Sequence, residues 1–413
     1  MHQELPAKNS DWDNERTQSE FFISNDMTPA ATKTGQNILI VANCAWNIWN
    51  FRQSLLERLA ADGCNLICAA PPDGYERFLS TLPGIRFVPL RRLSRKSLSL
   101  ISNWHTLIEL CRLLRQESPD LVMLYTIKPN IFGSMAARLT GTPAIATIEG
   151  LGYTATAPAP LRKLIFFLYQ LAFRFVCKVV FLNHDDWADF LYNRVVPPAK
   201  ALVIKGIGVD TGHFFPGREN AYSEPVFLFI GRLLADKGIR YFVEAARRTK
   251  AVVPEARFQI LGKIDATNPT SISTDELDGW IRDASIEHLG HSDDVRPFIA
   301  NSHVVVLPSY REGMPRALLE GMAMGKSIIT TDSVGCRETV DEGCNGYIVP
   351  AEDAIALSGA MLRFIALTPV EKNVMGRYSR RKALTEFSND VVLPQYLRLI
   401  ANILKKTLRN KRI

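Results

Sequence analysis

Two glutamates eight residues apart stand where they could flank the start of a helix. The apolar run 303–307 is continuous and β-branched, which is typical of a buried parallel strand. A helix is expected to begin near Pro315 and to end at Gly325, because proline suits a first turn and glycine suits the position after the last turn. Glu312 then lies in the strand-to-helix turn, and Glu320 lies within the helix.

Such a helix start could bind an anion. Free N–H groups and the positive end of the helix dipole attract a phosphate, and carboxylates on either side can accept hydrogen bonds from hydroxyl groups. This combination suits a sugar nucleotide, with Gly313, Met314 and Pro315 next to the donor. For glutamates considered alone, a helix cap at Glu312 and a solvated side chain at Glu320 are the simpler interpretation.

A second turn favours the sugar-nucleotide site over this simpler interpretation. The segment 227–238 has the pattern of a strand, a glycine turn and a helix start, with Gly231, Arg232 and Lys237 at the turn. With both motifs in order, the chain resembles the retaining glycosyltransferases of family 4. In that family a strand-Gly-Arg turn and a nearby lysine bind the donor diphosphate, and two glutamates spaced as here bind the donor sugar and the ribose. The resemblance covers nearly everything from residue 37 to the C-terminal helix.

The resemblance implies roles for individual residues. Arg232, Lys237 and Glu312 are expected at the catalytic centre, and Glu320 beside the nucleotide. Many family members carry histidine where Glu149 stands. Glu149 is therefore expected either to take a direct part in catalysis or to hydrogen-bond a hydroxyl group.

Loops after the strands of the first half are expected to bind the acceptor, because ligands of open α/β sheets bind at the carboxyl ends of the strands. The expected residues are Asn43, Asn47, Lys128, Gly150 and Gly152. The triplet 150–152, followed by an aromatic residue, resembles a subgroup that extends polyprenyl-diphosphate-linked sugars. For the first loop, an alternative is that an asparagine caps the next helix while the neighbouring tryptophans pack.

The elements that must position these residues alternate along the chain. Short apolar runs separated by helical stretches predict a doubly wound α/β domain over 37–215 and a second one over 216–390. Two Rossmann-like domains facing across a cleft make the GT-B architecture, in which the first domain binds the acceptor and the second the nucleotide sugar. Residues 391–413 are expected to form a helix that returns to the first domain, with a basic tail. Residues 1–36 are polar and without pattern, which favours a disordered extension.

Composition limits the partners and the compartment. The chain has 413 residues, 47% of them hydrophobic, which is enough for more than one core. A net charge of +7 favours an acidic partner. Nucleic acid is not expected, because neither zinc-finger spacing nor interleaved basic and aromatic residues are present. Seven cysteines without a C-x-x-C pair, and a start without an apolar signal region, predict a cytoplasmic protein.

Two stretches suggest contact with an anionic membrane surface. The segment 91–98 is basic with interleaved leucines, and 161–175 carries five aromatic residues beside three cations. Neither is a transmembrane span, because polar residues interrupt the second run well short of about 20 residues. A solvated surface and a core helix are the respective alternatives. The tail 405–412 adds a third basic patch.

No metal or other cofactor is expected. The acidic pairs 185–186 and 293–294 each precede a helical pattern and are interpreted as caps. The resemblance implies a peripheral enzyme on the inner face of the cytoplasmic membrane. It would move a hexose or N-acetylhexosamine, with retention, from a UDP-type nucleotide sugar to a polyprenyl-diphosphate-linked saccharide in bacterial surface polysaccharide or glycan assembly. The alternatives are a soluble acceptor, a sugar-nucleotide epimerase or hydrolase, and a binding protein without turnover.

Overall fold

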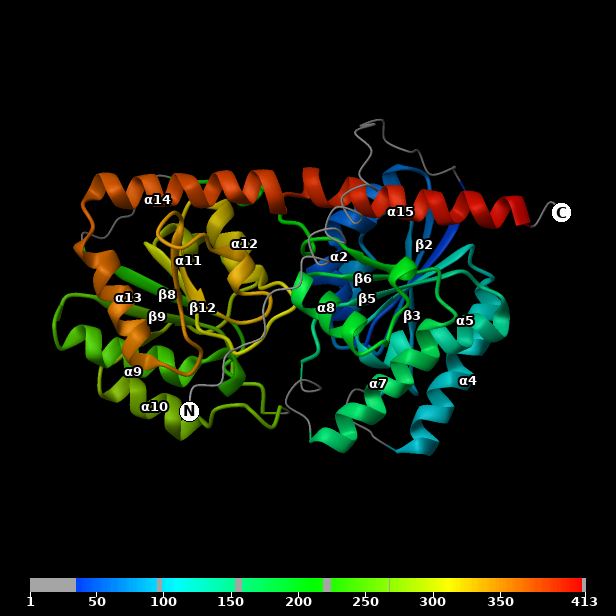
Figure 1. Ribbon diagram of the computed structural model, residues 1–413, viewed down its shortest axis with the longest axis horizontal. Coiled ribbons are helices and arrows are strands. Elements are labelled where there is room, and N and C mark those ends of the chain that lie inside the picture. Colours follow the sequence, from blue (N-terminus) through cyan, green and yellow to red (C-terminus); the bar gives the residue numbers. More distant parts are fainter. Residues whose placement is uncertain (1–34, 95–98, 153–157, 218–223, 267, 411–413) are drawn as a thin grey trace, which may run out of the picture.

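The computed structural model describes residues 35–94, 99–152, 158–217, 224–266 and 268–410, apart from the side chains of 408–410. The described chain forms two parallel sheets, each with helices on its faces, and the last helices follow one another along the molecule, with α14 on one half and α15 on the other (Figure 1). The two Rossmann-like domains expected from the sequence are therefore confirmed.

The N-terminal domain holds a seven-stranded sheet in the order β3-β2-β1-β4-β5-β6-β7. Its strands are β1 (Asn37–Val41), β2 (Asn65–Ala70), β3 (Ile85–Pro89), β4 (Leu121–Tyr125), β5 (Ala144–Ile148), β6 (Lys178–Phe181) and β7 (Ala201–Val203). Its helices are α2 (Ala45–Ala61), α3 (Glu76–Leu79), α4 (Leu100–Glu117), the π-helix η1 (Pro129–Gly133), α5 (Ser134–Thr140), α7 (Ala159–Phe173), α8 (His184–Tyr192) and the 3₁₀ helix η2 (Pro198–Lys200).

The C-terminal domain holds a six-stranded sheet in the order β10-β9-β8-β11-β12-β13. Its strands are β8 (Val226–Ile230), β9 (Arg257–Leu261), β10 (Glu287–His288), β11 (Val304–Leu307), β12 (Ser327–Thr331) and β13 (Gly346–Val349). Its helices are η3 (Ala235–Lys237), α9 (Ile239–Lys250), α10 (Thr274–Arg282), α11 (Arg296–Ala300), α12 (Arg316–Ala323), η4 (Arg337–Thr339), α13 (Ala354–Ala366) and α14 (Pro369–Lys382). After α14 the chain continues through the π-helix η5 (Ala383–Phe387) into α15 (Asn389–Asn410).

The central strands are buried on both faces, as helices on both sides of a parallel sheet require. Every residue of β4, β5, β8, β11 and β12 is buried. The strand order reverses between β1 and β4 in one sheet and between β8 and β11 in the other. Ligands of open α/β sheets bind at such reversals, beyond the carboxyl ends of the strands. The turns after β8 and β11 are the two that the sequence assigned to the donor.

The last helix belongs to the core of the first domain. Val392, Tyr396 and Ile400 of α15 are buried in the same cluster as Ile38 and Ile40 of β1. The predicted return of the C-terminal helix is thus confirmed. At the crossing, the backbone N–H of Val209 donates to Phe387 O at 2.9 Å, so the two chain segments that connect the domains lie side by side.

Among the described residues, no single helix is both long and apolar enough to cross a bilayer. The pair Ala354–Ala366 and Pro369–Phe387, bent by 116°, meets the length and composition criteria only when taken together.

Candidate active site

The turns after β8 and β11 contact one another directly. Their strands are neighbours in the sheet, so both turns leave the same edge. Tyr310 N–H and Ser309 Oγ–H both donate to Asp236 O, at 3.0 and 3.1 Å. Gly238 has φ +73°, and a Cβ there would collide with the carbonyl oxygen of Pro308. Glycine is needed at this position for both reasons, and it allows the two motifs to meet.

Lys237 and Glu312 form an ion pair at this meeting point. Lys237 Nζ donates to Glu312 Oε1, and the two side chains are 20% and 13% exposed. Glu312 N–H donates to Val334 O at 2.9 Å, which fixes the backbone of its turn. The lysine and the glutamate that the sequence placed at the donor therefore lie at one partly enclosed point.

Arg232 lies on the same turn but has a different partner. Its Nη1 donates to Asp265 Oδ2 at 3.1 Å, and its side chain is 42% exposed. Asp265 was not identified from the sequence. An exposed guanidinium at this turn can still contact an anion that enters from solvent.

Glu320 is not on a solvated helix face. It is 6% exposed, and Arg316 Nε donates to its Oε1 at 2.5 Å. Burial raises the pKa of the Glu320 carboxyl, and the charge of Arg316 opposes that rise. Pro315 occupies the position before the first residue of α12, as expected. A contact between Glu320 and the ribose stays a prediction.

The loop after β5 packs backbone to backbone against the turn after β11. A Cβ at Gly313 would collide with the carbonyl oxygen of Glu149, and a Cβ at Gly150 would lie 2.9 Å from Gly313 N. The two domains therefore meet at the residues next to Glu312. Met314 is buried beside them. Close approach of the domains explains these glycines, whatever contact they also make with a ligand.

Glu149 is held by two residues of α2. Arg52 Nη2 donates to Glu149 Oε1, and Asn47 Nδ2 donates to Oε2 at 3.1 Å. Arg52 is 4% exposed, and its guanidinium lies over the ring of Tyr125 at 4.1 Å. Burial alone would lower the pKa of Arg52, but the charges of Glu149 and the nearby tyrosines outweigh it and raise that pKa. Both oxygens of Glu149 are thus occupied by internal donors.

This arrangement changes the interpretation of the first loop. The position before the first residue of α2 is Cys44, and its side chain makes no capping bond, so neither Asn47 nor Asn50 is the cap of this helix. Asn47 orients Glu149 instead. Sequence reasoning missed Arg52 because an arginine on an amphipathic helix has the pattern of a solvated residue.

The other expected acceptor residues are Asn43, Lys128 and Gly152. Asn43 is partly buried after β1, and Gly152 is exposed. Lys128 precedes η1, and burial lowers the pKa of its ammonium group. The aromatic residue after Gly152 lies outside the described residues. Contacts of these residues with an acceptor stay predictions.

Comparisons with known proteins cover both halves of the chain. Residues 48–205 match the model described as a glycosyl transferase 4-like domain, and residues 224–366 match the model described as glycosyl transferases group 1. A Campylobacter jejuni protein named N,N'-diacetylbacillosaminyl-diphospho-undecaprenol alpha-1,3-N-acetylgalactosaminyltransferase is 27% identical over 376 residues, which are 87% of this chain and 96% of that protein.

Two further known proteins resemble this chain. An Escherichia coli protein named UDP-Gal:alpha-D-GlcNAc-diphosphoundecaprenol alpha-1,3-galactosyltransferase is 26% identical, over 74% of this chain and 82% of that protein. The crystal structure of Anabaena HepE in complex with UDP-glucose superposes with a TM-score of 0.73 at 16% identity, over 89% of this chain and 99% of that one. The structural likeness supports the two-domain fold.

Proposed function

We propose that this chain, which belongs to the group 1 glycosyltransferases, transfers a hexose or N-acetylhexosamine from a UDP-type sugar to a polyprenyl-diphosphate-linked saccharide, with retention. Both named relatives act, by their names, on sugars linked to undecaprenol through a diphosphate. The product would serve bacterial surface polysaccharide or glycan assembly. The observation that carries the proposal is the meeting of Lys237 with Glu312 where the turns after β8 and β11 are hydrogen-bonded together.

The chemistry follows from the charges at this point. When the bond between C1 of the sugar and the diphosphate oxygen breaks, negative charge grows on the leaving group. Lys237, Arg232 and the start of α12 would stabilise that charge more in the transition state than in the ground state. Glu312 would accept hydrogen bonds from hydroxyl groups of the donor sugar. This assignment needs no metal ion, so transfer should persist in excess EDTA.

In this proposal Glu149 does not remove the acceptor's proton. Arg52 and Asn47 occupy both of its carboxylate oxygens. We therefore assign the acceptor's proton to an oxygen of the departing diphosphate. The new bond joins C1 to the acceptor oxygen on the face that the diphosphate leaves, which gives retention.

Incubation of the purified protein with a panel of nucleotide sugars and a lipid-linked acceptor tests the proposal. The expected product is a lipid-linked saccharide that is longer by one sugar, with the anomeric configuration of the donor preserved by NMR. Conversion of the donor without acceptor would instead identify an epimerase or hydrolase. Extension of a soluble sugar phosphate in place of the lipid would identify the other transferase class.

Replacing Glu320 with alanine should weaken the binding of free UDP by roughly tenfold or more. Hydrogen bonds to a charged group contribute about 1.5–3 kcal/mol each, and a buried carboxylate could accept two from a ribose. Calorimetric titration with UDP measures the change. Glu244→Ala is the matched control, because this exposed carboxylate of α9 pairs only with neighbouring arginines of its own helix among the described residues. Unchanged affinity in the Glu320 variant would remove this residue from the nucleotide site.

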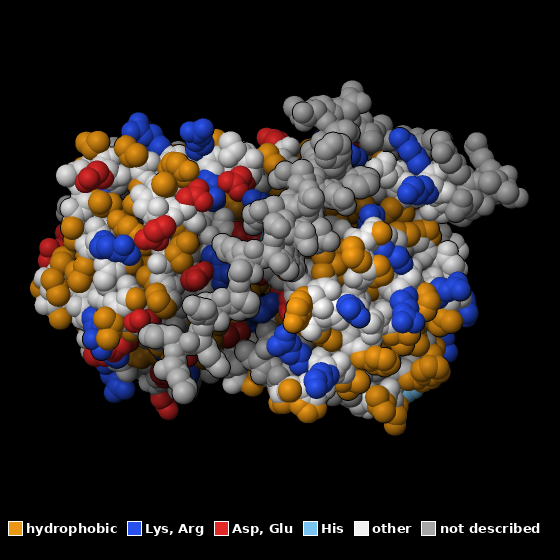
Figure 2. Space-filling model, viewed as in Figure 1, with side chains coloured by type: hydrophobic (Ala, Val, Ile, Leu, Met, Phe, Trp, Pro, Cys, Tyr) orange, Lys and Arg blue, Asp and Glu red, His pale blue; other side chains and the backbone are white. Residues whose placement is uncertain are grey.

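We also propose that the N-terminal domain binds an anionic membrane through α4 and α7. Phe166, Tyr169 and Phe173 of α7 are buried, so the core-helix interpretation holds for that face. On the opposite side Phe167 is 60% exposed, and Trp104 of α4 is 61% exposed. Hydrophobic and basic side chains gather on the part of the surface where Figure 1 shows these helices (Figure 2).

A basic cavity lies between the end of β3 and the middle of α4. It has a volume of about 590 Å³, and its lining includes Arg91, Arg92, His105 and Arg112. Exposed apolar side chains beside cations fit an interface that contacts acyl chains and phosphate headgroups together. Residues 95–98 of the basic segment expected from the sequence lie outside the described residues. The proposed location is therefore the cytoplasmic face of the membrane.

Replacing Arg91 and Arg92 with serine should reduce partitioning onto anionic vesicles by roughly thirtyfold, from about 1 kcal/mol per cation near the headgroups. UDP binding should be unchanged. Vesicle sedimentation measures the effect, and raising the salt should reproduce it in the parent, since the attraction is screened. Arg248→Ser with Arg363→Ser, on exposed positions of the C-terminal domain, is the control. Sedimentation equal to that of the parent would exclude this surface.

A further inference from the structure

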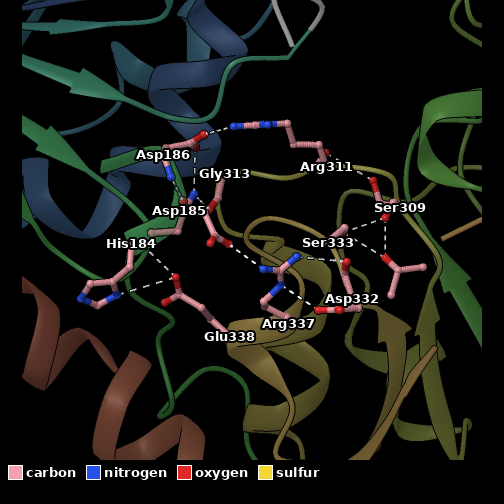
Figure 3. A network of polar contacts seen from close by, with 12 residues as sticks. His184, Asp185, Asp186, Ser309, Arg311, Gly313, Asp332, Ser333, Arg337 and Glu338 are labelled. Carbon is pink, nitrogen blue, oxygen red and sulfur yellow. Dashed lines mark hydrogen bonds and ion pairs between the residues drawn. The ribbon is translucent and has the colours of Figure 1, made fainter. Parts of the chain in front are cut away.

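The start of α8 in the N-terminal domain reaches the turn that carries Glu312 (Figure 3). Asn183 follows β6, and its side-chain oxygen accepts from Asp186 N–H at 2.7 Å, so Asn183 is the cap of α8. Its amide nitrogen donates to Gly313 O at 2.7 Å and to Asp186 Oδ2 at 2.9 Å. A single capping residue therefore also binds the backbone of the other domain.

Asp186 completes the contact with a buried charge. Its side chain is 0% exposed, and its Oδ1 accepts from Nη2 of Arg311, whose side chain is 25% exposed. The sequence-based interpretation of this aspartate as a helix cap is wrong, since Asn183 caps the helix. Burial raises the pKa of the Asp186 carboxyl, and Arg311 and Asn183 oppose that rise. An ion this deeply buried is costly to leave without its partner.

Glu312 lies between the two residues that the N-terminal domain binds. Arg311 precedes it and pairs with Asp186, and Gly313 follows it and accepts from Asn183. The carboxylate of Glu312 is thereby aimed at Lys237. The residues on both sides of Glu312 are thus bound by the N-terminal domain, while Glu312 N–H itself donates to Val334 O within its own domain.

We propose that Asp186 and Asn183 are positioning residues for Glu312, so that its contact with the donor sugar forms only when the two domains are together. The inference rests on the proposed transfer reaction. Glu320 and its partner Arg316 lie on one helix of the C-terminal domain, so the nucleotide portion of the donor binds without this contact. The N-terminal domain would then control the orientation of the sugar, while the C-terminal domain alone holds the nucleotide.

A neighbouring ion pair provides a matched control. Asp185 precedes Asp186 in the same turn and pairs with Arg337 of the C-terminal domain at 3.5 Å. Both side chains are exposed, at 36% and 41%, and ion pairs of this kind contribute little. Asp185→Asn changes the same charge on the same helix turn, without a bond to the residues beside Glu312.

The test compares Asp186→Asn with Asp185→Asn in the full-length enzyme. Asp186→Asn should lower kcat by roughly tenfold to 10²-fold, the scale of a small misplacement at a reacting centre. The affinity for UDP should stay within about threefold of the parent, because only orientation changes. Asp185→Asn should stay within about twofold in both quantities. A parallel loss of UDP affinity and kcat in Asp186→Asn would mean a general structural role and would overturn the inference.

Three further variants cover the case in which Asp186→Asn does not fold. The double variant Asp186→Asn with Arg311→Gln removes both charges together, which avoids an unpaired buried ion. It should fold and show reduced kcat with nearly unchanged UDP affinity. Arg311→Lys keeps the charge and should retain more kcat than Arg311→Gln.

The outcomes separate the two proposals. If the parent enzyme is active and Asp186→Asn, or the folded double variant, has the same kcat, only the positioning role is overturned. A parent without transfer to a lipid-linked acceptor would overturn the proposed function and, with it, this inference.

Discussion

Replacing Lys237 with alanine is expected to lower turnover by roughly 10²-fold or more, the cost of removing one fixed positive group from a developing anion. The lysine is 20% exposed and is aimed at the turn of Glu312, so solvent screens it only in part. The measurement is the rate of sugar transfer at saturating donor and acceptor. The loss should appear in kcat, because the interaction strengthens as the diphosphate departs.

Arg232→Ala should also lower kcat. The loss should lie at the lower end of the range given for Lys237→Ala, because the Arg232 side chain is more exposed to solvent. Arg248→Ala is the matched control for both, because this arginine is 48% exposed on α9 and pairs within its own helix. Near-normal kcat in both turn variants would refute the assignment of the diphosphate to the turn after β8. A loss confined to KM would instead indicate that the cations bind donor and transition state equally.

Replacing Arg52 with methionine is expected to lower the free energy of unfolding by roughly 3–5 kcal/mol, since removing one partner of a buried pair leaves the other charge uncompensated. Arg52 is 4% exposed, and it also lies over the ring of Tyr125. Glu149 would keep only its bond from Asn47. Urea-induced unfolding followed by tryptophan fluorescence measures the change.

A double variant separates the cost of an unpaired charge from the cost of lost packing. Arg52→Met combined with Glu149→Leu should recover much of the loss, because apolar groups of similar size can replace a buried pair. Arg58→Met on the same helix is the control, since Arg58 is 47% exposed and its replacement should change the free energy by about 0.5 kcal/mol or less. Equal unfolding midpoints for the Arg52 and Arg58 variants would contradict the prediction.

Continuous apolar runs made most of the fold predictable. The apolar run 303–307 predicted β11 to within one residue, because that strand is a short run of buried residues. The two-residue strand Glu287–His288 was missed, since its polar residues pair at the edge of the sheet and give no apolar signal.

The candidate site was predictable where glycine and charge occur together in a turn, and it was not predictable across the domain contact. Lys237 and Glu312 were both identified, and the structure joins them. Arg311 and Asp186 are 125 residues apart, and the residues around each of them do not indicate that the two side chains are in contact. Arg52 was missed for the same reason, because its partner lies in the loop after β5.

Because α15 is buried in the first domain, the residues that form this domain are not continuous in the chain. Tyr396 and Ile400 supply one wall of the core whose other wall is the sheet that begins at residue 37. A fragment that ends at residue 215, the predicted domain boundary, would contain every strand of the first sheet and still lack that wall. The first domain is therefore assembled from both ends of the polypeptide, and a ribosome must complete nearly the whole chain before that domain can close.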